Sequence, residues 1–244
     1  MRDRLIVGNW KMNGDLATNA RLLRRLAAEW RAPGGRVLAV CVPTPYLAQA
    51  QSELRASAVA WGAQDVSEHV KGAYTGDVSA AMVAEFGARY AIVGHSERRQ
   101  LHGETDAVVA AKARAALAAG LVPIACVGET LAERERGDTD SVVAREVDAL
   151  TDALGADTSR IVVAYEPIWA IGTGRTATPE QAQAVHAAVR ARLARAGAGD
   201  VPILYGGSVK AANAAALFAM ADIDGGLVGG ASLDADEFLM LGRA

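Results

Sequence analysis

The sequence has little of what marks secreted, membrane-bound or nucleic-acid-binding proteins. Only two of its 244 residues are cysteines. Cys41 and Cys126 both lie in apolar, strand-like runs, so we expect reduced thiols and a cytoplasmic protein. No apolar run reaches the length of about 18 residues that a membrane-spanning helix needs, and the first four residues show no signal-peptide pattern. The net charge of −3 favours neither nucleic acid nor an anionic membrane as a partner.

A break in composition, a low-complexity stretch and a linker are also missing. Residues 1–244 are therefore predicted to form one domain, and 51% of them are hydrophobic, which suits amphipathic helices around a buried sheet. Eight short apolar runs alternate with helix-like segments. These runs are Leu5–Asn9, Val37–Val42, Val59–Gly62, Tyr90–Val93, Val122–Val127, Ile161–Tyr165, Ile203–Tyr205 and Gly225–Val228.

The alternation of strands and helices predicts an α/β protein with a parallel sheet. Eight units of roughly thirty residues each are the number expected for a closed (β/α)8 barrel, whose active site lies at the carboxyl ends of the strands. An open, doubly wound sheet is the alternative, although such a sheet has no need for eight repeats.

The sixth apolar run leads directly to a candidate catalytic base. Glu166 follows Ile161–Tyr165, and Pro167 ends the strand because it cannot donate a ladder hydrogen bond. Alternation along the strand puts Glu166 on the same inward face as Val162 and Ala164. A carboxylate in this position is poorly solvated, so we expect its pKa to be raised, as suits a general base.

Two further strands are predicted to end in polar side chains. Asn9 and Lys11 continue the inward row of the first strand, and His95 continues a row of Ala91 and Val93 on the fourth. Any one such residue could be structural or solvated. Three placements of this kind in one barrel indicate an active site.

The histidine at the end of the fourth strand is predicted to be neutral. His95 lies where a strand gives way to a helix, and a helix N-terminus disfavours positive charge, so the ring should donate a hydrogen bond. The other histidines, His69, His102 and His186, are interpreted as surface residues. No group of His, Cys, Asp and Glu has metal-ligand spacing, so no metal is expected.

Glycines after the last two strands indicate a phosphate site. One group is Gly206–Ser208 and the other is Gly229–Ser232. Glycines let backbone N–H groups approach an oxyanion, and a helix expected to begin near Ala231 would point its N-terminus at the same place.

The segment after Glu166 is predicted to be a lid. Residues 168–176 combine an apolar tip with two glycines, of which Gly172 could place an N–H on a phosphate. A new helix should then begin with Thr178 as its N-cap, Pro179 in the first turn and Gln181 completing a capping box.

Three motifs together resemble the triosephosphate isomerase family, and the resemblance extends over essentially the whole chain. They are Gly8–Asn13 (GNWKMN), Tyr165–Gly174 (YEPIWAIGTG) and Leu227–Ser232 (LVGGAS). The resemblance implies a single-domain TIM barrel, an isomerase of glycolysis and gluconeogenesis that interconverts dihydroxyacetone phosphate and D-glyceraldehyde 3-phosphate through an enediolate, and no cofactor. It also implies a homodimer with the loop around Thr75 at the interface.

The resemblance also implies a role for individual residues. A glutamate base with a neutral histidine electrophile is the arrangement known for this family, and here it falls on Glu166 and His95. The catalytic residues would be His95, Glu166 and Lys11; the substrate-binding residues would be Asn9, Lys11, Gly172, Ser208, Gly229 and Gly230; and Glu97 would support them. Glu97 could instead be a helix-initiating acid, and Lys112 could either pair with Glu97, as the resemblance implies, or extend its charge to solvent along an apolar surface.

Two rival functions are open at this point. One is another phosphate-binding barrel, such as a sugar-phosphate epimerase or an isomerase of amino-acid biosynthesis, although these lack the predicted lid sequence. The other is a catalytically silent barrel that serves as a binding partner. Intact Lys11, His95 and Glu166 argue against the second.

Overall fold

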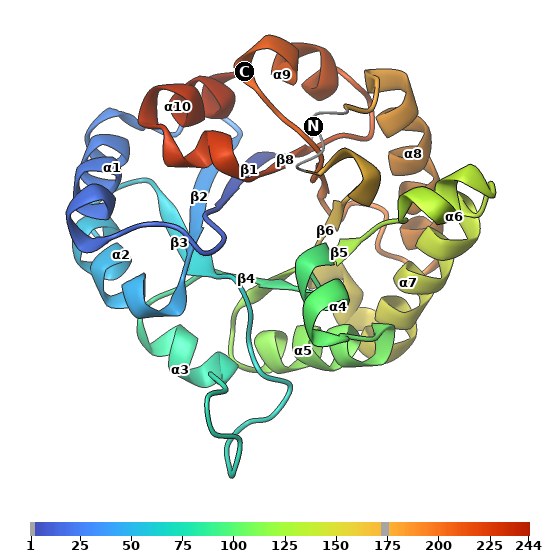
Figure 1. Cartoon of the computed structure of the whole chain (residues 1–244), viewed down its shortest axis with the longest axis horizontal. Coiled ribbons are helices and arrows are strands. Elements are labelled where there is room, and N and C mark those ends of the chain that lie inside the picture. Colours follow the sequence, from blue (N-terminus) through green and yellow to red (C-terminus); the bar gives the residue numbers. More distant parts are fainter. Residues whose placement is uncertain (1–2, 172–175) are drawn as a thin grey trace.

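The computed structural model describes residues 3–171 and 176–244. Eight parallel strands form a closed barrel in the order β1-β2-β3-β4-β5-β6-β7-β8, and β1 pairs with β8 to complete it (Figure 1). The open-sheet alternative is therefore wrong. Each predicted apolar run lies within one residue of an observed strand at both ends. The strands are β1 (Arg4–Asn9), β2 (Arg36–Val42), β3 (Ala60–Ala63), β4 (Tyr90–Val93), β5 (Val122–Val127), β6 (Val162–Tyr165), β7 (Ile203–Tyr205) and β8 (Gly225–Val228).

Helices surround the barrel as an outer ring (Figure 1). The α-helices are α1 (Leu16–Glu29), α2 (Leu47–Leu54), α3 (Ala80–Glu85), α4 (Ser96–His102), α5 (Asp106–Ala118), α6 (Leu131–Glu135), α7 (Thr139–Leu154), α8 (Pro179–Arg195), α9 (Ala211–Phe218) and α10 (Ala235–Arg243). Short 3-10 turns are η1 (Thr44–Tyr46), η2 (Gly155–Arg160), η3 (Ile168–Ala170) and η4 (Gly230–Leu233).

The start of α8 confirms the predicted capping box. Thr178 accepts a hydrogen bond from the Gln181 N–H, and the Gln181 side chain accepts one from the Thr178 N–H. The element after β8 differs from the prediction. The helix expected to begin near Ala231 is divided: the chain first forms the 3-10 turn η4 and then begins the α-helix α10 at Ala235.

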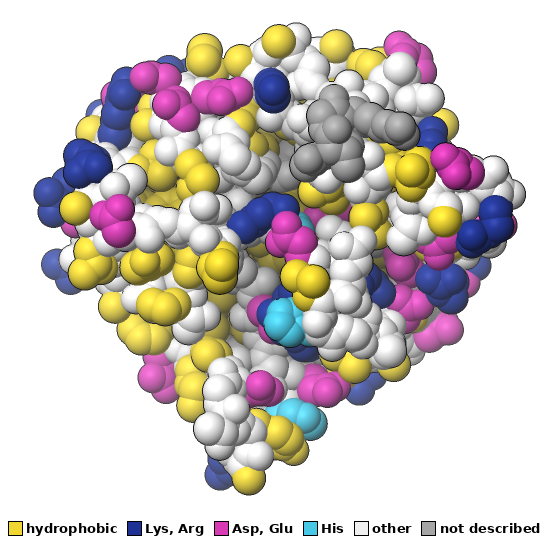
Figure 2. Space-filling view, viewed as in Figure 1, with side chains coloured by type: hydrophobic (Ala, Val, Ile, Leu, Met, Phe, Trp, Pro, Cys, Tyr) yellow, Lys and Arg dark blue, Asp and Glu magenta, His cyan; other side chains and the backbone are white. Residues whose placement is uncertain are grey.

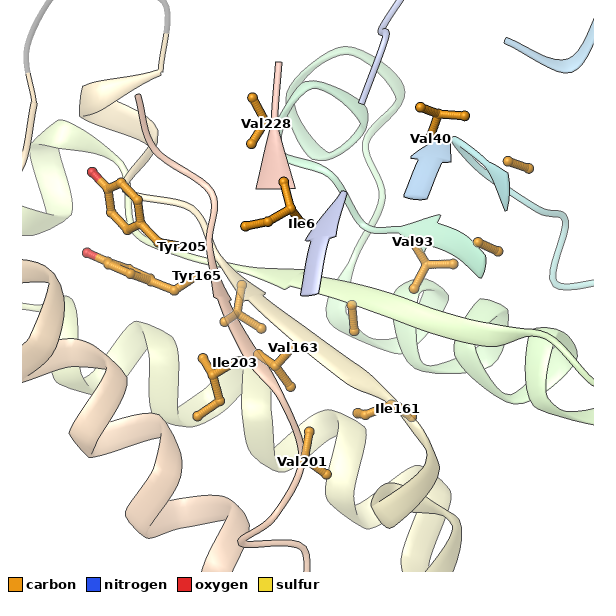
Figure 3. Close-up of a cluster of buried hydrophobic side chains, with 14 of the residues drawn as sticks. Ile6, Val40, Val93, Ile161, Val163, Tyr165, Val201, Ile203, Tyr205 and Val228 are labelled. Carbon is orange, nitrogen blue, oxygen red and sulfur yellow. The ribbon is translucent and has the colours of Figure 1, made fainter. Parts of the chain in front are cut away.

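The buried side chains form two separate cores, one inside the barrel and one between the strands and the helices. The inner core comprises Leu5, Val7, Ala39, Cys41, Tyr90, Ile92, Ile124, Cys126, Val162, Ala164, Leu204 and Leu227. Part of the outer core, including Ile6, Val93, Val163 and Ile203, is drawn in Figure 3. Neighbouring residues along a strand alternate between the two cores, as the period of a β-strand requires.

The predicted inward row of β4 is wrong. Ile92 faces the barrel interior, whereas Ala91 and Val93 face the helices. His95 still reaches the carboxyl end of the barrel because the strand ends at Val93 and Gly94 turns the chain with a φ of 67°. A Cβ at Gly94 would lie 2.5 Å from Val109, so glycine is needed for the turn and for the contact.

A long loop (64–79) joins β3 to α3 and projects away from the barrel (Figure 1). Near its tip, the rings of His69 and Tyr74 are stacked with centroids 3.8 Å apart. Over residues 3–171 and 176–244, no helix is long and apolar enough to cross a membrane. Cys41 and Cys126 are buried free thiols.

Candidate active site

A cavity of about 590 Å³ opens at the carboxyl ends of the strands. Figure 2 views this end of the molecule, where charged and hydrophobic side chains surround the hollow. The cavity brings together most of the predicted site residues, which come from β1, β4, β6, β7 and β8 and the segments that follow them. These are Asn9, Lys11, His95, Glu166, Ser208, Gly229 and Gly230. Gly172 lies outside the described residues.

Glu166 is held by two hydrogen-bond donors immediately after β6. Its Oε1 lies 3.0 Å from His95 Nε2, and its Oε2 accepts a hydrogen bond from the Ser96 N–H at 2.8 Å. The side chain is buried. Burial raises the pKa of Glu166, but His95, the Ser96 N–H and Lys11 lower it. Their combined effect is larger than that of burial, so the net shift is downward. The predicted upward shift is therefore wrong for this arrangement, because the carboxylate exchanges water for donors and a positive field.

The hydrogen bonds of His95 assign the position of its proton. His95 is the N-cap of α4, and its Nδ1 accepts the Glu97 N–H at 3.2 Å. Nδ1 must be unprotonated to do so, which leaves the proton of a neutral ring on Nε2, facing Glu166. Burial lowers the pKa of His95 and the Glu166 carboxylate raises it, with a net upward shift. Full protonation would nevertheless break the Nδ1 bond, so the geometry favours the predicted neutral ring.

Lys11 lies just beyond β1 in a backbone conformation that is rare for a residue with a side chain. Its φ is 52°. Asn9 Oδ1 accepts the Lys11 N–H at 3.0 Å, and Gln64 donates to the Lys11 carbonyl at 2.9 Å, so both neighbours stabilise this turn. Such local strain is typical of functional sites, where the surrounding structure holds a side chain in place.

Glu97 supports the site through a different partner from the one predicted. Its carboxylate forms an ion pair with the ammonium group of Lys11. Lys112 instead contacts Asp65 and Glu104, and its side chain is buried. The predicted Glu97–Lys112 pair is therefore wrong, because two other carboxylates surround the Lys112 ammonium.

The glycine-rich segments after β7 and β8 pack closely around the cavity. A Cβ at Gly206 would lie 2.8 Å from Glu166 Cγ, and one at Gly207 would lie 2.3 Å from the hydroxyl of Tyr205. On the other segment, a Cβ at Gly229 would be 3.6 Å from Lys11 Cε. The absence of a side chain at Gly206 lets the backbone approach the base, whereas Gly229 lies in ordinary contact with the lysine.

The sequence analysis missed Glu129, which binds the segment after Glu166. Glu129 is fully buried and accepts hydrogen bonds from the Tyr165 hydroxyl at 3.1 Å and from Trp169 Nε1 at 2.9 Å. Arg134 pairs with the same carboxylate at 3.1 Å and covers the Trp169 ring at 4.4 Å. Glu129 follows β5, so the rule that identified the other strand-end residues could have found it.

Two further predictions concern residues that the structure buries. His186 was interpreted as a surface residue, but it is fully buried, and burial lowers its pKa to about 4. Cys126 lies in the inner core, and burial with the nearby Glu166 charge raises its thiol pKa well above the ordinary value. This agrees with the position of Cys126 in an apolar, strand-like run of the sequence. Within the part of the chain that the structure describes, no group of three or more His, Cys, Asp or Glu side chains could hold a metal ion.

Comparison with known proteins gives one consistent result. The family model described as Triosephosphate isomerase matches residues 4–244. A triosephosphate isomerase of Delftia acidovorans is 63% identical over 243 residues, which is 99% of this chain and 98% of the relative. Those of Thiobacillus denitrificans (63% over 248 residues, 100% of this chain and 99% of the relative) and Bordetella pertussis (62% over 244 residues, 100% and 98%) are similar.

Proposed function

Because this chain belongs to the triosephosphate isomerase family, we propose that Glu166, His95 and Lys11 carry out its reaction. The chain is an aldose–ketose isomerase that interconverts dihydroxyacetone phosphate and D-glyceraldehyde 3-phosphate, a step of glycolysis and, in the reverse direction, of gluconeogenesis. The observation that carries the assignment of residues is the 3.0 Å contact between Glu166 and His95, which line the same cavity as Lys11.

Glu166 is the base. An ionised carboxylate takes a proton from one carbon of the substrate, which leaves an enediolate. A proton then passes between the two enediolate oxygens, and the protonated carboxyl group returns its proton to the neighbouring carbon. In the structure described here, Glu166 is occupied by two donors, Ser96 N–H and His95 Nε2. When the carboxylate turns towards a substrate it leaves these donors, while the burial that raises its pKa remains. The turn would therefore make the carboxylate a stronger base.

His95 and Lys11 stabilise the negative charge of the intermediate. Once Glu166 has turned away, the Nε2–H of His95 is free to donate to an enediolate oxygen. The Lys11 ammonium adds a fixed positive field, oriented by Asn9 and Glu97. Both groups are in place before the reaction, so little free energy is spent on rearranging them.

The substrate phosphate is placed against the glycine-rich ends of β7 and β8. Ser208, Gly229 and Gly230 line the cavity there. Backbone N–H groups of such a turn are well suited to a phosphate dianion. The contact of Gly172 with the phosphate and the closure of residues 168–176 over the site stay predictions from the sequence.

We also propose a homodimer in the cytoplasm, with residues 1–244 as one domain. The projecting loop (64–79) and the exposed apolar side chains Met12, Val70 and Tyr74 support an interface between two copies of the chain. The two buried free thiols suit a reducing compartment. Analytical ultracentrifugation of the purified chain tests the assembly.

The remaining rival is a silent barrel, since family membership excludes the other phosphate-binding barrels. Purified chain is mixed with D-glyceraldehyde 3-phosphate and a dehydrogenase that reduces dihydroxyacetone phosphate with NADH. We expect rapid NADH oxidation, which should vanish in a Glu166→Gln, His95→Gln double variant prepared in parallel. Equal rates of NADH oxidation for the two proteins would refute the assignment of both residues.

A further inference from the structure

Glu146 is a buried carboxylate that the proposed reaction does not use. It lies on the buried face of α7, beside Val143 and Val147, and is 5% exposed. A charge in such a place is costly unless it is satisfied. Its Oε2 accepts a hydrogen bond from the Gly128 N–H at 2.7 Å, and its Oε1 lies 3.7 Å from Arg99 Nη1.

The backbone of Gly128 lies directly against the backbone of Glu166. A Cβ at Gly128 would be 1.8 Å from the carbonyl oxygen of Glu166, so no side chain fits between them. The residues on either side of Gly128 are hydrogen-bonded to the segment that contains Glu166. The Glu166 N–H donates to the Val127 carbonyl at 2.7 Å, and the Ile168 N–H donates to the Glu129 carbonyl at 3.2 Å. The chain after β5 is thus the support of Glu166 and η3.

We propose that Glu146 is a positioning residue for the isomerisation, because its carboxylate holds the Gly128 N–H and thereby fixes the backbone behind Glu166. This rests on the proposed role of Glu166 as the base. A hydrogen bond to an ionised carboxylate is stronger than one to a neutral acceptor, so the support is firmest when Glu146 is ionised. Proton transfer is sensitive to small displacements of the base. The phosphate is bound from β7 and β8, so kcat should respond and KM should not.

The surroundings of Glu146 make this support sensitive to pH. Burial raises the pKa of Glu146 to about 7, opposed by Arg99 and the Gly128 N–H. Arg145 on the same helix also lies 3.7 Å from its carboxylate, while Asp106 at the start of α5 raises the pKa. The neighbouring Cys126 is held as a neutral thiol. As the pH falls through 7, Glu146 takes up a proton and its hold on Gly128 weakens.

The first test observes the support directly. The ¹⁵N–¹H signal of the Gly128 amide is followed from about pH 5.5 to 8.5 in the parent and in Glu146→Gln. We expect a titration with a midpoint near 7 in the parent and none in the variant. An amide that does not titrate in the parent, or that titrates equally in both, overturns the proposal. Since this signal requires no catalysis, it also separates the proposal from the proposed function, which fails if the parent does not isomerise triose phosphates.

The second test measures the consequence for turnover. Glu146→Gln keeps an acceptor for Gly128 but stays neutral, so it mimics the protonated parent at every pH. The ratio of its kcat to that of the parent should fall from near one at about pH 6 to about one third or less at about pH 8, with KM unchanged. Titration of the substrate phosphate cancels in this ratio. A ratio independent of pH contradicts the proposal.

Two further variants complete the design. Asp148→Asn removes one negative charge from the same helix, where Asp148 pairs with Arg192 at the surface, so its kcat ratio to the parent should not change with pH. Glu146→Ala leaves the Gly128 N–H buried without an acceptor, and its kcat should fall about tenfold or more at every pH. If Glu146→Ala does not fold, Glu146→Gln still tests the proposed role of Glu146.

Discussion

The backbone N–H of Ser96 donates a hydrogen bond of 2.8 Å to the Glu166 carboxylate, and this joins the first turn of α4 to the end of β6. The donor belongs to a helix N-terminus, where partial positive charge stabilises an anion. Together with His95, it keeps the pKa of Glu166 below its ordinary value although the side chain is buried. Glu166 is therefore ionised in the free enzyme.

Replacing the Ser96 N–H is expected to raise the pKa of Glu166. Ser96 is the first residue of α4, where proline is tolerated, and His95 before it has φ −51° and ψ 142°, which a following proline allows. In Ser96→Pro the carboxylate loses a donor but stays buried, so the acid limb of kcat/KM should move to higher pH. Initial rates at low substrate concentration across the pH range measure this shift.

Ser96→Ala is the matched control, because it removes the hydroxyl and keeps the N–H. Its kcat/KM profile should have the same acid limb as the parent. Equal displacement in both variants would mean that the backbone donor does not set the pKa of Glu166.

Glu166→Gln is expected to abolish turnover but not substrate binding. The amide keeps the shape of the carboxylate but cannot accept a proton, and general base catalysis alone is typically worth about 10²–10⁴-fold. A competitive inhibitor that carries a phosphate should still bind in isothermal titration calorimetry, because its phosphate contacts lie at β7 and β8. Activity within about tenfold of the parent would refute the role of Glu166.

Much of this architecture could be predicted because a parallel barrel repeats one pattern. The apolar runs located all eight strands, and the end of each strand indicated where polar side chains such as Asn9, His95 and Glu166 should meet. Strand-end position alone was sufficient for this, since all carboxyl ends of parallel strands lie at one end of the barrel.

The pattern of apolar strands could not predict which residues, distant in the sequence, contact one another in the fold. Lys112 has two carboxylates within reach that are 47 and 8 residues away along the chain, and neither pairing leaves a local signal. The downward pKa shift of Glu166 depends on His95 and on the Ser96 backbone N–H, which is 70 residues away. Glu146 did leave a trace, as a charged residue within the apolar stripe of α7, but only the structure shows that Gly128 is its partner.

Thr75→Arg is expected to weaken the proposed dimer and activity together. Thr75 is exposed near the tip of the projecting loop, and an arginine buried in an interface without a partner would cost free energy. Sedimentation velocity at several protein concentrations, with activity measured on the same samples, checks both effects. A fully active monomer would contradict the proposed assembly.

The stability of the protein should reflect the titration of Glu146. Its pKa is raised from 4.5 to about 7, so the stability it contributes is fully present below pH 4.5 and is lost as the pH rises through 7. A shift of this size corresponds to about 3 kcal/mol. Between pH values below 4.5 and above 7, the unfolding free energy of the parent should therefore fall by about this much relative to that of Glu146→Gln. Urea unfolding of both proteins at fixed protein concentration measures the unfolding free energies. If the difference between them did not change with pH, the pKa of Glu146 could not be near 7.

Gly128→Ala tests whether the chain after β5 supports the base. The new Cβ would be 1.8 Å from the Glu166 carbonyl oxygen, so one of the two backbones must move. Overpacking of this kind costs about 1–3 kcal/mol. If the base moves, kcat should fall by up to about 10²-fold, since a displacement near 1 Å can cost that much. Gly34→Ala is the control, because a Cβ there would meet nothing within 4 Å, and both its stability and kcat should equal those of the parent. Should Gly128→Ala lose stability but keep the parent's kcat, the β5 segment yields without moving Glu166, and its role as a support is wrong.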